Sequence, residues 1–195
     1  MSRLLRNTIL AGLAVLALLA VGACGESHTR VTTGTYSGGS GKNAPYLNVG
    51  ALVYEVQLSR QLNPYDTEDA SYMLGLTPTQ RQLLPGEEWF GVFMQVYNNG
   101  DVPHPAATDF TISDTQGNTY SPLTLGPANL FAYRPGLVPS GGRVPALNTV
   151  AANGPTQGAL LLYKIKVLSL NNRPLELKIV DPGNAAQTAS AELDV

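Results

Sequence analysis

Apolar and polar residues alternate in short runs along residues 46–195, as expected for β-strands that bury one face. The clearest run spans residues 89–97. One face of this run carries only large apolar side chains, namely Phe90, Val92, Met94 and Val96. The opposite face carries Phe93 and Tyr97 beside Gln95, so it also offers aromatic groups for burial. The run therefore predicts a central strand that is covered on both sides, as in a β-sandwich.

Other runs, with turn signals between them, predict the remaining strands. Residues 46–58 alternate as one half-buried strand, and a turn follows at Asn63-Pro64. Residues 110–113 and 118–120 flank Asp114-Thr115-Gln116-Gly117, which indicates a β-hairpin with Gly117 where the backbone needs a positive φ. The last strands are expected over residues 158–168, 175–180 and 188–195.

Helical periodicity is confined to one short segment. Thr67 to Gly75 begins with acids and ends in glycine, which is typical of one or two helical turns. The pattern as a whole predicts an all-β fold, an antiparallel immunoglobulin-like β-sandwich of about seven strands, after a signal peptide and a flexible tether.

A positive segment followed by an apolar segment stands at the start of the sequence. Residues 1–6 carry two arginines and no acid, and residues 8–20 are almost wholly apolar, which is the order of a secretory signal peptide. A transmembrane helix is disfavoured because the apolar run is shorter than the roughly 20 residues needed to span a bilayer.

The residues that follow, Val21-Gly22-Ala23-Cys24-Gly25, resemble the lipobox of bacterial lipoproteins. The resemblance implies cleavage before Cys24, followed by attachment of a diacylglyceryl group and palmitate to Cys24. Two acyl chains would hold the protein stably at a membrane. An ordinary secretory cleavage that leaves Cys24 as a free thiol is the alternative.

Composition divides the chain into three segments. We predict a lipoprotein signal peptide over residues 1–23, a lipid-anchored flexible tether rich in Gly, Ser and Thr over residues 24–45, and a single domain over residues 46–195. The formal net charge is −2, and no cluster of Lys and Arg occurs, which argues against nucleic acid as a partner.

Few residues are candidates for metal chemistry. The chain has two histidines, His28 and His104, which are too few for a typical zinc site. Adding Met73 and Met94 gives a conceivable copper site, but Met94 belongs to the apolar strand face and suits a core position better. We therefore expect neither a metal ion nor a cofactor.

Acidic residues suggest two further kinds of site, a calcium site and a protease site. Asp66, Glu68 and Asp69 are close in sequence, but they lack the spacing of a calcium loop, and a solvated helix start is the better interpretation. Asp114 begins a sequence with some likeness to an aspartic protease motif, but no second copy exists for the two-carboxylate mechanism. No serine nucleophile motif is present either. We therefore expect no enzymatic activity.

Residues 125–155 are crowded with proline and glycine and form a long connection, of a kind that often carries function. Within it, Phe131, Tyr133 and Arg134 are of types enriched at protein interfaces, so they are candidate partner-binding residues. In the alternative interpretation, Leu130 and Phe131 plug the end of the sandwich while Tyr133 caps it.

Three sequence segments resemble a known family. They are Phe90-x-Val92-Phe93 leading to Asn98-Asn99, Phe110-x-Ile112-x-Asp114-x-x-Gly117-x-x-Tyr120, and Gly158-Ala159-Leu160-Leu161-Leu162-Tyr163. Together they look like the immunoglobulin-like domain of bacterial secreted lipoproteins, a domain of unknown function whose sandwich also occurs in secreted mycobacterial antigens. The similarity spans residues 50–195 and implies the fold and an extracytoplasmic location, but no catalytic residues.

These expectations combine into one functional hypothesis. The protein would be a non-enzymatic cell-envelope lipoprotein, anchored through Cys24 on the extracytoplasmic side of the cell membrane, that binds a protein or another envelope component. The alternative is a carrier of a small ligand or metal that uses a cleft near His104 and the long connection.

Overall fold

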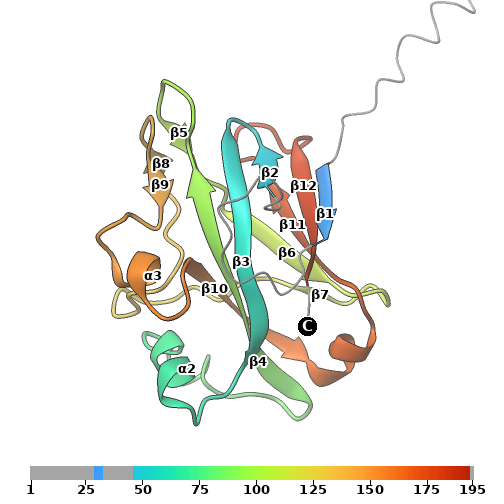
Figure 1. Cartoon of the computed structure of the whole chain (residues 1–195). Coiled ribbons are helices and arrows are strands. Elements are labelled where there is room, and N and C mark those ends of the chain that lie inside the picture. The colour runs from blue at the N-terminus through green and yellow to red at the C-terminus, as the bar shows by residue number, and fades with distance from the viewer. Residues whose placement is uncertain (1–28, 33–45, 194–195) are drawn as a thin grey trace, which may run out of the picture.

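Two β-sheets packed face to face form the body of the protein in the computed structural model, which describes residues 29–32 and 46–193 (Figure 1). The strands are β1 (Thr29–Thr32), β2 (Tyr46–Val49), β3 (Leu52–Leu62), β4 (Glu87–Tyr97), β5 (His104–Pro105), β6 (Asp109–Ser113), β7 (Thr119–Tyr120), β8 (Leu137–Val138), β9 (Arg143–Val144), β10 (Ala159–Lys166), β11 (Leu175–Val180) and β12 (Thr188–Leu193). The helices are α2 (Thr67–Tyr72), α3 (Val150–Asn153) and the 3-10 helix η1 (Val167–Asn171).

The strand order confirms the predicted antiparallel sandwich. One sheet has the order β1-β12-β11-β6-β7, and the other has the order β10-β4-β3-β2, with β9 paired to the end of β4. Only the pair β1 and β12 is parallel among the strand pairs of the described residues. The strands of four or more residues within residues 46–193 match the predicted number of about seven.

The main core lies between the two sheets. Strand β4 runs through it, and its residues Phe90, Val92, Met94 and Val96 all face this core, as the sequence predicts. The facing sheet contributes alternate residues of β6, β11 and β12, which the period of two places on one side.

Two details of the second sheet differ from the sequence prediction. The run 46–58 is not one strand, because a tight turn at Gly50, with φ of 59°, divides it into β2 and the start of β3. Further along β3, the pairing with β4 shifts between Val56 and Leu58. This bulge sends Val56 to the main core but Leu58 to the opposite face of the sheet, since an extra residue reverses the alternation.

A second apolar cluster covers the outer face of the β10-β4-β3 sheet. Phe93 of β4 lies at its centre and packs edge-on against Tyr72 of α2, with ring centroids 5.0 Å apart. Phe131 of the long connection also packs edge-on against Tyr72, with ring centroids 4.8 Å apart. Helix α2 and the long connection therefore form a third layer, on the side where α2 and α3 lie in Figure 1. This layer explains why both faces of β4 are apolar.

The N-terminal segments are only partly described. Strand β1 falls within residues 24–45, for which we predicted a flexible tether, and it adds four residues to the edge of the first sheet. Cys24 and the predicted signal peptide, residues 1–23, lie outside the described residues. Within the described part of the chain, no helix has the length and apolar character needed to cross a bilayer.

Candidate functional site

Helix α2 begins with a capped N-terminus on the outer face of the second sheet. The side chain of Asp66 accepts hydrogen bonds from the backbone N–H groups of Glu68, at 2.9 Å, and Asp69, at 3.2 Å. These bonds satisfy donors that have no partner inside a helix, and they fix where α2 starts.

A partly buried ion pair connects this helix to β3. The Asp69 side chain, in a residue only 4% exposed, accepts two hydrogen bonds from the Arg60 guanidinium, at 2.5 and 2.9 Å. The backbone N–H of Asn63 donates a third bond at 2.7 Å. Although burial alone would raise it, the pKa of Asp69 is lowered by the bonds from Arg60 and Asn63. The predicted solvated helix start is therefore wrong for Asp69.

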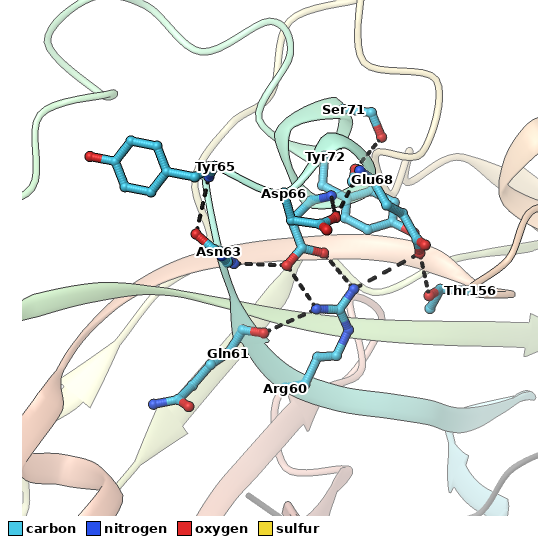
Figure 2. A network of polar contacts seen from close by, with 10 residues as sticks. Arg60, Gln61, Asn63, Tyr65, Asp66, Glu68, Ser71, Tyr72 and Thr156 are labelled. Carbon is cyan, nitrogen blue, oxygen red and sulfur yellow. Dashed lines mark hydrogen bonds and ion pairs between the residues drawn. The ribbon is translucent and has the colours of Figure 1, made fainter.

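Glu68 extends this polar network to Thr156, directly after the long connection, as Figure 2 shows. Its carboxylate accepts hydrogen bonds from the Tyr72 hydroxyl at 2.7 Å and from the Thr156 hydroxyl at 3.1 Å. Burial, together with the neighbouring Glu68 carboxylate, raises the pKa of Tyr72 to about 12. The carboxylates of Asp66, Glu68 and Asp69 thus accept hydrogen bonds from different groups. They do not converge on one point as calcium ligands would.

The other end of α2 is also held by the long connection. The side-chain amide of Asn129 donates to the carbonyl oxygens of Tyr72, at 2.7 Å, and Leu74, at 3.0 Å. The backbone N–H of Gly126 donates to the carbonyl of Gly75 at 3.1 Å. Helix α2 is short, and these contacts at both ends fix its position on the sheet.

An open hollow of about 410 Å³ lies beside α2. It is bounded by the helix, by the loop that follows the helix and by the start of β4. Its lining consists of Pro64, Ala70, Met73, Leu74, Arg81 and Trp89. Five of these six residues are apolar, and none is acidic. The volume falls within the range of about 300–1,000 Å³ that is typical of small-molecule sites.

The candidate partner-binding residues of the long connection do not share one environment. Tyr133 is buried in the main core, where its hydroxyl donates to the carbonyl of Ala107 at 3.0 Å, so it offers little surface to a partner. Phe131 is half-buried against Tyr72. Arg134 is exposed and donates to backbone carbonyls of the same connection, including that of Leu125 at 2.6 Å. Leu130, which the alternative interpretation placed in a plug, is exposed.

A second hollow, of about 420 Å³, lies at the end of the sandwich near His104. It opens where the β2–β3 turn, β5 and the β11–β12 loop meet at the top of Figure 1. Its polar lining includes His104, Asp181, Asn184 and Gln187. The Asp181 carboxylate lies against Gly50, where an added Cβ would be 2.6 Å from its oxygen, so glycine is required there.

The remaining metal candidates are not brought together. Met94 lies in the main core, whereas Met73 lies in the outer cluster on the opposite face of the sheet. Among residues 29–32 and 46–193, no three His, Cys, Asp or Glu side chains lie close enough to hold a metal ion. His28 lies outside the described residues.

Asp114 is a structural residue of the predicted hairpin. Its carboxylate accepts backbone hydrogen bonds from Gln116 and Asn118, both at 2.9 Å, and Gly117 adopts the predicted positive φ, 82°. The same carboxylate accepts from the Ser169 hydroxyl at 2.7 Å, which joins the hairpin to η1. The hairpin interpretation is therefore confirmed.

Sequence reasoning missed the Arg60–Asp69 pair and the hollow beside α2. One signal was available for the first. Arg60 stands between Leu58 and Leu62 at the spacing of one strand face, and a charged residue on an apolar face indicates a buried partner. The hollow could not be predicted, because Arg81 lies in a loop and Trp89 lies in β4. Their spacing in the sequence does not indicate that they line the same hollow.

The sequence matches no family model and no curated protein. Solved structures share its architecture. The yjhA protein of Bacillus subtilis is 13% identical with a TM-score of 0.50, over 76% of this chain and 96% of its own. The ycdA protein of Bacillus subtilis, provisionally described as a lipoprotein, has a TM-score of 0.48 at 10% identity, over 78% of this chain; this chain spans only 39% of that protein.

An uncharacterized β-sandwich protein of Clostridium difficile has a TM-score of 0.45 at 10% identity, over 87% of this chain and 96% of its own. At such low identities, a structural likeness concerns the fold alone. The chain is an all-β protein of the β-sandwich class, with an added outer layer built from α2 and the long connection.

Proposed function

We propose that the protein is a non-enzymatic binding module of the cell envelope, held on the outer side of the membrane by a lipid on Cys24. The anchor follows from the likeness of residues 21–25 to a lipobox. The binding role rests on the long connection. Three of its leucines are among the most exposed large apolar residues of the described chain: Leu130 at 65%, Leu137 at 72% and Leu147 at 68%.

The backbone of the long connection, which carries these leucines, is held to the rest of the protein. The connection is fixed to the main core by Tyr133 and to β10 by backbone hydrogen bonds between Tyr133 and Leu160, at 2.8 Å, and between Leu160 and Phe131, also at 2.8 Å. Apolar side chains presented on a fixed backbone lose little conformational freedom when they are covered. Exposed apolar side chains on a fixed backbone offer a protein partner apolar surface to bury, which supports the proposed binding role.

Photo-crosslinking in the native cells tests this proposal. A photoreactive residue at position 137 or 147 should capture the same envelope protein, and the same residue in place of Lys178, which is exposed on β11 of the other sheet, should capture none. The Cys24→Ser variant should move from the detergent phase to the aqueous phase of Triton X-114 and lose the crosslink. Equal capture from all three positions, or unchanged partitioning of the Cys24→Ser variant, would contradict the proposal.

A carrier of a metal or small cation is the second candidate, and the hollow near His104 supports it. The imidazole of His104 and the carboxylate of Asp181 both line that hollow, and each can bind a cation. Calorimetric titration of the full chain with copper, zinc and calcium tests this function. Tight binding that is lost in both His104→Ala and Asp181→Asn would favour the carrier, whereas no measurable heat with any of the three ions would exclude these ions as its cargo.

A further inference from the structure

We propose that the hollow beside α2 binds a free single-chain amphiphile with a negatively charged head group, of the fatty-acid type. The alkyl chain would lie against Met73 and Trp89, and the head group would pair with Arg81. This inference goes beyond the proposed binding module. It concerns a different part of the molecule from the exposed leucines, so either proposal can fail without the other.

The lining of the hollow suits an alkyl chain. Trp89 and Met73 are both buried residues of the outer apolar cluster, and they form its inner part. Leu74, Ala70 and Pro64 supply the remaining apolar surface. A thioether side chain adapts its shape to different apolar ligands, and the indole offers a large flat surface. Removing an alkyl chain from water against such groups is favourable.

Arg81 is the one charged residue among those that line the hollow, and it favours an anion. Arg81 is exposed at its edge, and its guanidinium forms no hydrogen bond or ion pair with any residue in the described part of the chain. Lys164 adds a second positive charge, with its ammonium 5.4 Å from the centre of the Trp89 ring. The acids Glu68 and Asp69 do not line the hollow, and their carboxylates contact Arg60 and Tyr72 instead. A guanidinium can donate two parallel hydrogen bonds to one carboxylate.

The walls of the hollow are held in place without a ligand. The Arg60–Asp69 pair fixes α2 on one side, as Figure 2 shows for the network around Arg60. The loop that carries Arg81 is fixed on the other side, because the Lys164 ammonium donates to the carbonyl of Gln82 at 2.6 Å. A preformed site needs little ordering when a ligand enters, which favours binding of a small molecule.

The same observations favour a free amphiphile over a bilayer surface. Segments that bind anionic membranes usually present four to eight Lys and Arg residues together. Only one arginine lines this hollow, with one lysine nearby. The apolar surface also includes Trp89, a lining residue that is only 3% exposed and therefore offers little area to a flat surface. A single chain can enter the hollow, whereas a flat headgroup layer cannot.

The fluorescence of Trp89 provides a direct test, because this residue is the only tryptophan in the chain. The full chain would be placed in neutral phosphatidylcholine vesicles and titrated with dodecanoate that carries a terminal bromine, which quenches tryptophan on contact. We expect saturable quenching. The brominated trimethylammonium analogue should quench only at much higher concentrations, since its charge has the same sign as that of Arg81.

Variants separate the two parts of the proposed site. Arg81→Gln should raise the half-saturation concentration of the carboxylate about fivefold or more, as expected for loss of a charge-assisted hydrogen bond, and leave that of brominated dodecanol unchanged. Arg173→Gln, a matched change at an exposed arginine far along the chain, should alter neither. Ala70→Leu should fill the hollow and weaken both ligands. Circular dichroism would establish that each variant is folded.

Three results would overturn the proposal. The first is the absence of saturable quenching in the unchanged protein. The second is an equal affinity for the carboxylate in the folded Arg81→Gln variant. The third is strong quenching by brominated phosphatidylglycerol placed in the vesicle, which would make the bilayer itself the occupant of the hollow.

Discussion

Replacing Asp114 with alanine is expected to lower the free energy of unfolding by about 4 kcal/mol, because several hydrogen bonds to one charged group are lost together. Asp114 is only 7% exposed, and its carboxylate accepts from two backbone N–H groups of the hairpin and from the side chains of Ser169, Asn118 and Asn172. Alanine would remove the acceptor that these donors share. Urea unfolding at neutral pH, followed by circular dichroism, measures the loss.

The Asp114→Asn variant tests whether the charge itself carries this effect. Burial alone would raise the pKa of Asp114, but the bonds from Ser169, Asn118 and Asn172 hold it well below its ordinary value of 3.8. A carboxylate with a lowered pKa contributes its full stability above that ordinary value, and the contribution is lost as the pH falls through the lower pKa of the folded state.

Unfolding measured between about pH 5 and about pH 2.5 should therefore show a steeper loss of stability in the unchanged protein than in Asp114→Asn. The difference should approach about 1.4 kcal/mol per pH unit, the limit for one titrating group. Asp69 also has a lowered pKa, but it is present in both proteins, so it cancels in the comparison. The same pH dependence in both proteins would show that the Asp114 charge is not responsible.

Local patterns predicted those parts of the fold in which neighbouring residues decide the structure. The alternation from Phe90 to Val96 placed β4 in the centre of the sandwich, and Gly117 marked the hairpin turn. The turn at Gly50 was missed because apolar residues continue on both sides of it: Leu47 and Val49 are buried before the turn, and Leu52 and Tyr54 after it. A period of two does not reveal where a strand reverses.

Features that depend on distant residues could not be predicted in this way. Tyr133 lies in a segment rich in proline and glycine, yet it is a core residue, because its ring packs edge-on against Phe110 with centroids 5.1 Å apart. Asp69 has the sequence context of a solvated helix start, and its burial depends on hydrogen bonds from Arg60 on β3 and from the backbone N–H of Asn63. The pattern of β4 showed that its second face would be covered, but it did not reveal that α2 and the long connection would cover it.

The largest effect of a single added methyl group is expected at Gly158, directly before β10. Its φ is 120°, and an added Cβ would lie 2.8 Å from the backbone nitrogen of Met94 and 3.0 Å from the carbonyl carbon of Phe93. Both atoms belong to the main chain of β4, the central strand, so neither can move without disturbing the sheet. Gly158→Ala should therefore lower the free energy of unfolding by about 3 kcal/mol or more, from backbone strain and overpacking together.

Alanine substitutions at two other glycines distinguish backbone strain from overpacking. Gly117 has a φ of 82° but open space around it, so Gly117→Ala should cost only the backbone strain, about 1 kcal/mol. Gly136 has neither a positive φ nor any atom within 4 Å of an added Cβ, so Gly136→Ala should be nearly neutral. Urea unfolding of the three variants should give losses that rise from Gly136 to Gly117 to Gly158. Equal losses at Gly117 and Gly158 would mean that the close approach of Gly158 to the β4 backbone contributes nothing to the loss, contrary to this prediction.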